Sequence, residues 1–273
     1  MPGAPDPEYV QARRVLLDVL GILAPHLPGL TLVGAQAVYL HTGAADIAVP
    51  EYTTDADMAI APELISDRPL LEDALTEAGF RLPSNPGRWI GPGGIPLDLM
   101  VPEALAGPGR RGADLGVHGR RAARRARGLE GALVDREKTT LTSLDPDDDR
   151  RCEIWVAGPA ALLVAKVIKI DERTGTTGRV VDKDALDAFR LLRAVPTDDL
   201  AAGLGMLLGH ELSAETTREA LSALPRLFGS LESEGIVMAC RAASPVVDAD
   251  ELAASIVILV GDLLDCLRGG TQA

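Results

Sequence analysis

The stretch Thr53-Thr54-Asp55-Ala56-Asp57-Met58-Ala59-Ile60 places two carboxylates two residues apart inside an otherwise apolar run. Successive side chains of a β-strand point to opposite faces, so Asp55 and Asp57 share one face and the apolar residues share the other. Such a strand can seat Mg²⁺, which prefers oxygen ligands and is often shared with substrate phosphates. The pattern alone is more typical of a strand end whose acids face water. The rest of the chain therefore decides between a metal site and a strand end that faces water.

The composition bounds the class of protein. The chain has 273 residues, enough for one large domain or two modest ones, and 47% are hydrophobic, which excludes wholesale disorder. Aromatic residues make up 3% and the net charge is -13, which disfavours base-stacking platforms and non-specific adhesion to nucleic acid or anionic membrane. Scattered cysteines, the absence of a signal-peptide pattern and the absence of a bilayer-spanning apolar run predict a cytoplasmic protein without a membrane partner.

Hydrophobic periodicity divides the chain near Gly158. Before it we expect helices over residues 8–24, 36–41 and 65–78, and strands over 30–33, the aspartate stretch, 88–90, 95–101, 132–134 and 152–156. After it we expect helices over residues 160–170, 182–194, 198–209, 215–228 and 248–267. The prediction is an α/β (α+β) domain over residues 1–157 followed by a helical domain over 158–273.

A second motif runs from a predicted strand through small residues into a predicted helix, over Leu30-Thr31-Leu32-Val33-Gly34-Ala35-Gln36-Ala37. Small residues let a phosphate approach the backbone, and a helix N-terminus offers unpaired N–H groups and a positive dipole end. Gly34, Ala35 and Gln36 are therefore candidate phosphate-binding residues, with the Gln36 amide as a hydrogen-bond donor. An ordinary strand-to-helix turn is the alternative, and it is commoner for this pattern alone.

Asp98 is a third candidate, because it interrupts an apolar strand over residues 95–101. A buried carboxylate without a partner is costly, so we expect either a neighbouring metal site or an arginine partner. Together with Asp55 and Asp57, Asp98 gives three carboxylates, a set suited to two-metal phosphoryl transfer. Asp98 would then orient or deprotonate the attacking hydroxyl.

The joint order of these motifs resembles the DNA polymerase β-type nucleotidyltransferase fold, a mixed sheet flanked by helices. Residues 162–173, Arg179 and residues 182–187 are similar to the helical signature of AbiEii-like nucleotidyltransferases, which include toxins of toxin–antitoxin and phage-defence systems. The resemblance covers roughly residues 28–193.

The resemblance implies a Mg²⁺-dependent enzyme that transfers a nucleoside monophosphate from an NTP to an acceptor hydroxyl, with the tRNA 3′ end as acceptor and an antitoxin as partner. It implies that Lys166 contacts the triphosphate, that Asp184 supports the site and that Lys169 is a second candidate for phosphate contact. Without the resemblance, the two lysines are equally typical of a solvated helix face, and Asp184 is more typical of one.

The chain also departs from the family pattern. Gly34-Ala35-Gln36 carries no hydroxyl, and Glu51-Tyr52 stand where an arginine is usual. Two alternatives therefore stay open. The acceptor is a small molecule such as an antibiotic, or the chain is a catalytically dead member that binds nucleotide or a partner protein.

An arginine tract stands out in this acidic chain. Its members are Arg110, Arg111, Arg120, Arg121, Arg124, Arg125 and Arg127. Concentrated positive charge near the predicted site favours contact with RNA phosphates. A solvated loop paired with acids such as those at residues 147–149 is the equally weighted alternative.

Overall fold

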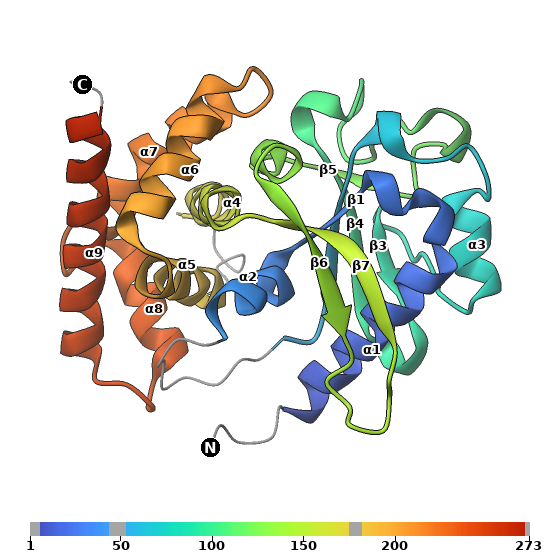
Figure 1. Cartoon of the computed structure of the whole chain (residues 1–273), viewed down its shortest axis with the longest axis horizontal. Helices are drawn as coiled ribbons and strands as arrows, with labels where there is room; N and C mark the ends of the chain where they lie inside the picture. Colours follow the sequence, from blue (N-terminus) through green and yellow to red (C-terminus); the bar gives the residue numbers. More distant parts are fainter. Residues whose placement is uncertain (1–5, 44–52, 175–181, 271–273) are drawn as a thin grey trace.

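The computed structural model describes residues 6–43, 53–174 and 182–270. Its helices are α1 (Pro7–Ile22), α2 (Gly34–Thr42), α3 (Leu71–Glu77), α4 (Pro159–Asp171), α5 (Asp182–Ala194), α6 (Thr197–Gly209), α7 (Ala214–Phe228), α8 (Glu234–Ala243) and α9 (Ala249–Gly270). Its strands are β1 (Leu30–Val33), β2 (Ala56–Ile60), β3 (Arg88–Ile90), β4 (Pro96–Pro102), β5 (Arg124–Ala126), β6 (Arg136–Thr142) and β7 (Arg151–Ala157). Figure 1 shows the sheet on one side, α6 to α9 on the other, and α2, α4 and α5 between them.

The strands form one mixed sheet in the order β3-β4-β2-β1-β7-β6, with β5 beside β4. β2 runs antiparallel to β1 and parallel to β4, so that Asp57 lies opposite Val33 on one side and Asp98 on the other. Paired residues of neighbouring strands point to the same face, and the strands lie about 4.8 Å apart. The α/β class and the helical second half of the chain are thus confirmed, and Asp57 and Asp98 share one face of the sheet.

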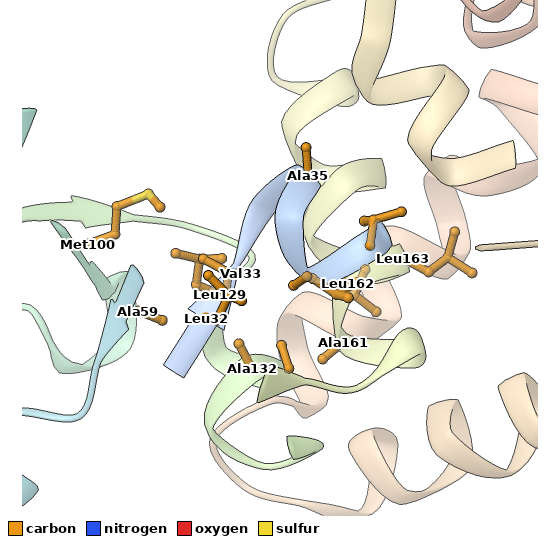
Figure 2. Close-up of a cluster of buried hydrophobic side chains, with 14 of the residues drawn as sticks. Leu32, Val33, Ala35, Ala59, Met100, Leu129, Ala132, Ala161, Leu162 and Leu163 are labelled. Carbon is orange, nitrogen blue, oxygen red and sulfur yellow. The ribbon is translucent and has the colours of Figure 1, made fainter. Parts of the chain in front are cut away.

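The core lies on both sides of this sheet. Ala56, Met58 and Ile60 of β2 are fully buried, as the alternation predicts, and α1 packs against β2 and β7. On the face that carries Asp57, a short 3-10 helix, η6 (Glu130–Leu133), brings Ala132 close to Ala161 of α4. Figure 2 shows this apolar contact, through which the sheet half and the helical half share one core.

Several predicted elements differ from the observed ones. The helix predicted over 65–78 begins only at Leu71, because Pro69 disfavours helical backbone in the residue before it and has no N–H to donate. The strand predicted over 132–134 is instead η6, and the neighbouring strand β6 was not predicted. β6 is a polar edge strand that pairs only with β7, so its sequence lacks the alternation of a half-buried strand. The helix α8 was also not predicted.

None of the helices within the described ranges is long and apolar enough to cross a membrane.

Candidate active site

The end of β1 brings the N-terminus of α2 against Asp57. Gly34 begins α2 with φ of +70°, a left-handed conformation that favours glycine. A Cβ on Gly34 would lie 2.1 Å from Oδ2 of Asp57. Among the described residues no side chain caps α2, so its first N–H groups are the donors that a helix N-terminus leaves without an intrahelical partner. Gly34 and Ala35 therefore lie where a phosphate held beside Asp57 could meet backbone donors.

Gln36 is hydrogen-bonded at both ends of its amide. Its side chain is buried, its Oε1 accepts a hydrogen bond from Nε of Arg13 at 2.9 Å, and its Nε2 donates to the backbone oxygen of Asp55 at 3.0 Å. Gln36 therefore positions the chain at Asp55, and one N–H of its Nε2 makes no hydrogen bond to Asp55.

Asp55 lies just before β2 and is held as an anion. Thr53 donates a hydrogen bond to Oδ1 of Asp55 at 2.6 Å, and Nζ of Lys183 lies 3.7 Å from the same oxygen. Burial acts to raise the pKa of Asp55, but Lys183 and the Thr53 hydrogen bond outweigh it and lower the pKa. Lys183 was not predicted as a site residue, because nothing local in the sequence shows that the first turn of α5 faces β2.

Asp57 is in the opposite electrostatic situation. Its burial, followed by the negative charges of Asp55 and Asp98, raises its pKa to about 7. Lys169 and Lys166 act in the other direction but do not compensate. The three predicted carboxylates are therefore brought together closely enough to repel one another.

Asp98 satisfies one of the two expectations for a buried strand acid. Its Oδ2 accepts hydrogen bonds from Arg88 at 3.4 Å and from Arg124 at 3.3 Å, so it has arginine partners. Its Oδ1 is buried and has no hydrogen-bond partner within the described chain. An unsatisfied buried carboxylate oxygen costs free energy, so this atom is available to a ligand.

Lys166 is enclosed in an ionic cluster between α4 and α5. Its Nζ lies 2.8 Å from Asp184 and 2.6 Å from Asp187, and all three side chains are buried. Burial acts to lower the pKa of Lys166, but the two carboxylates outweigh it and raise the pKa. For Asp184, burial acts to raise the pKa, and Lys166 and Lys169 outweigh it and lower the pKa. Lys166 thus has two anionic partners before any triphosphate binds.

Lys169 is the more exposed of the two lysines of α4. Its side chain is 40% exposed, and its Nζ lies 2.9 Å from Oδ2 of Asp184. Burial and then the charge of Lys166 lower the pKa of Lys169, against the opposing influence of Asp184 and Asp57. Lys169 therefore connects the ionic cluster of Lys166 to the carboxylates, and it is better placed than Lys166 to meet a phosphate.

The residues present fit a divalent cation in chemistry. Within residues 6–43, 53–174 and 182–270, no three His, Cys, Asp or Glu side chains are already gathered as a ligand set. Yet Oδ1 of Asp98 has no hydrogen-bond partner among the described residues, and Asp57 is raised in pKa by its burial and then by the negative charges of Asp55 and Asp98. Carboxylate oxygens are the ligands that Mg²⁺ prefers. Asp55, Asp57 and Asp98 are the residues that would hold it.

Four of the seven arginines of the tract pair with acids other than those at residues 147–149. Arg120 pairs with Asp114, Arg124 with Asp98, Arg125 with Glu103 and Arg127 with Glu219, whereas Asp148 pairs with Arg150. The expectation that residues 147–149 neutralise the tract is therefore wrong, because the tract folds back along β4 as β5. Arg179, Glu51 and Tyr52 lie outside the described residues.

No family model, curated protein or solved structure matches this chain. Its function is therefore inferred from the site and from the order of its motifs.

Proposed function

We propose that this chain is a Mg²⁺-dependent nucleotidyltransferase of the polymerase β type with an AbiEii-like helical half. The observation that carries the proposal is the juxtaposition of Asp57, Asp98 and the N-terminus of α2. Asp57 and Asp98 are paired on parallel strands, and Gly34 lets the helix N-terminus touch Asp57. A carboxylate set beside a phosphate-binding helix end is suited to phosphoryl transfer.

The proposed reaction is an in-line displacement at the α-phosphorus of an NTP. The acceptor hydroxyl oxygen forms a bond to that phosphorus, the bond to the bridging oxygen of the β-phosphate breaks, and pyrophosphate leaves. The hydroxyl proton passes to Asp98. Bound Mg²⁺ supplies neutralisation of the triphosphate and a lowered pKa of the attacking hydroxyl. Asp55 and Asp57 are the carboxylates that would hold the metal beside the triphosphate.

The chain's cations hold the leaving group. Lys183 pairs with Asp55 and Lys169 with Asp184, and the backbone N–H groups of Gly34 and Ala35 lie at the start of α2. Positive groups placed where negative charge collects on pyrophosphate stabilise the transition state. Lys166 and Asp184 act indirectly, because their cluster anchors Lys169.

The acceptor proposed from the resemblance is the tRNA 3′ end, which would make the chain a toxin that needs an antitoxin. A catalytically dead nucleotide-binding member is the second candidate. It is favoured by two observations: both ends of the Gln36 amide are engaged within the protein, and Asp98 is paired with two arginines.

Label transfer separates these functions. The purified chain is incubated with each α-³²P-NTP, Mg²⁺ and total tRNA, beside the variant Asp55→Asn/Asp57→Asn. The matched control is Asp147→Asn/Asp149→Asn, which removes two exposed aspartates of the same spacing. We expect labelled tRNA with the wild type and the control but not with the site variant.

Two other outcomes would change the assigned function. NTP binding by titration calorimetry without transfer to tRNA or to a small-molecule acceptor would support the catalytically dead alternative. A folded wild-type protein that neither binds nor transfers any NTP would overturn the nucleotidyltransferase assignment.

A further inference from the structure

A row of side chains on one face of the sheet changes charge from one strand to the next. Arg88 of β3 lies opposite Asp98 of β4, and Asp98 lies opposite Asp57 of β2. Arg124 of β5 reaches the same oxygen of Asp98 from a position two residues along β4. Asp98 therefore has a carboxylate on one flank and two guanidinium groups on the other.

Arg88 and Arg124 make only long contacts with Asp98. Their contacts are 3.4 Å and 3.3 Å, both to Oδ2, whereas charge-assisted hydrogen bonds are usually about 2.7–2.9 Å. Asp98 is the only acidic partner of either arginine in the described chain. The two guanidinium groups and the one carboxylate therefore carry a net charge of +1. The side chains of Arg88 and Arg124 are 48% and 36% exposed, so their remaining N–H groups can reach a ligand.

The arginines lie on the acceptor side of the site. In an in-line displacement, the attacking oxygen and the leaving group are on opposite sides of the phosphorus. The cations suited to the leaving pyrophosphate come from the helical half of the chain: Lys183 pairs with Asp55, and Lys169 is held by Asp184. The attacking hydroxyl then lies at Asp98, and Arg88 and Arg124 are the cations next to it.

We propose that Arg88 and Arg124 form an anion subsite that holds a phosphate of the acceptor, beside the hydroxyl that Asp98 serves. The inference rests on the proposed function and specifies its substrate class. The phosphate is a diester of a nucleic-acid strand near its 3′ end, or a monoester on a phosphorylated small molecule. Guanidinium groups bind both through paired N–H donors. A polycationic acceptor such as an aminoglycoside is disfavoured by repulsion.

The test measures acceptor binding separately from chemistry. The probe is a 5′-fluorescein RNA decamer with a free 3′ hydroxyl, and its matched form carries an uncharged methylphosphonate at the last linkage. Fluorescence anisotropy is recorded at one salt concentration, because phosphate contacts depend on salt. All variants carry Asp98→Asn, so that removing the arginines does not leave a buried carboxylate unpaired.

The variant Arg88→Gln/Arg124→Gln in this background is compared with Arg110→Gln/Arg111→Gln, which removes two exposed charges of the same tract. We expect the first pair of substitutions to weaken binding of the charged decamer about tenfold and to abolish its advantage over the methylphosphonate form. We expect the second pair to change binding about twofold or less. When the decamer binds the Asp98→Asn protein, equal losses in both pairs, or none in the first, would overturn the subsite.

Two further arms identify the source of the phosphate and separate this inference from the proposed function. Glucose 6-phosphate that binds in an Arg88- and Arg124-dependent manner, where RNA does not, supports the subsite with a small acceptor. Kanamycin binding that these substitutions leave unchanged or strengthen, with no binding of either phosphate probe, contradicts it. Calorimetry with Mg²⁺ and a non-hydrolysable NTP reports on the proposed function alone.

Discussion

Asp57 shows how one residue takes its properties from its neighbours. The negative charges of Asp55 and Asp98 act on this aspartate, and the backbone of Gly34 lies against its side chain. Its raised pKa of about 7 means that the folded chain holds a proton there that the unfolded chain releases at much lower pH. The spacing of Asp55 and Asp57 indicated the site, but no local pattern could indicate which carboxylate is protonated.

This difference predicts that Asp57 makes the metal-free protein less stable as pH rises. An acid with a raised pKa in the folded state costs stability progressively between the unfolded pKa and the folded one, here between about 4 and about 7. The slope for one proton is about 1.4 kcal/mol per pH unit. Urea unfolding of the wild type and Asp57→Asn from pH 5 to 8, in EDTA, checks this.

We expect the free energy of unfolding of Asp57→Asn to increase relative to that of the wild type as the pH rises to about 7. Above that pH we expect the difference to level off. Adding Mn²⁺ should stabilise the wild type more than the variant, because the cation favours the ionised carboxylate. A stability difference that is independent of pH would show that Asp57 is ionised throughout.

At the scale of elements, α4 and α5 are joined by charge as well as by apolar packing. The sequence predicted both helices from their periodicity, and α5 has the predicted bounds. It left the roles of Lys166, Lys169 and Asp184 to the resemblance, because a helical pattern does not show which face meets another helix. Asp184 pairs with three cations, whereas Asp187 pairs only with Lys166 within the part of the chain that the structure describes.

This asymmetry predicts different effects for two isosteric substitutions in α5. Asp184→Asn leaves Lys166, Lys169 and Arg173 without their shared carboxylate and should cost about 3 kcal/mol of unfolding free energy. Asp187→Asn should cost about half as much, because Lys166 keeps Asp184. Chemical denaturation of both variants at pH 7 measures the difference. An equal loss of unfolding free energy in the two variants, or a larger loss for Asp187→Asn, would contradict the inference that Asp184 contributes more than Asp187.

At the scale of the whole molecule, the two halves share a core and a candidate site. The backbone of Gly128 lies against Ile168 of α4, where a Cβ would come within 3.0 Å, and Ala132 lies near Ala161 (Figure 2). Lys169 and Lys183 come from the helical half, whereas Asp55 and Asp57 come from the sheet half. The boundary at residues 157 and 158 follows the change from strand to helix, but many contacts cross it.

We therefore predict that residues 1–157 do not fold alone. Without α4, the apolar side chains around η6 would be exposed, and burial of such surface is the main source of stability. The expressed fragment should lack near-ultraviolet circular dichroism and dispersed amide resonances, and co-expression with residues 158–273 should restore both. A fragment with native dispersion on its own would instead support two independent domains.

The α/β class, the helical second half, the buried face of β2 and the three candidate carboxylates could all be predicted from the chain's residue pattern, because alternation and helical periodicity are local properties. Only the tertiary structure decided that Lys183 faces Asp55, that Gln36 supports Asp55 from inside the protein, and that Arg88 and Arg124 flank Asp98. These contacts join residues far apart in the chain. They depend on strand order and helix packing, which the pattern of any one segment does not contain.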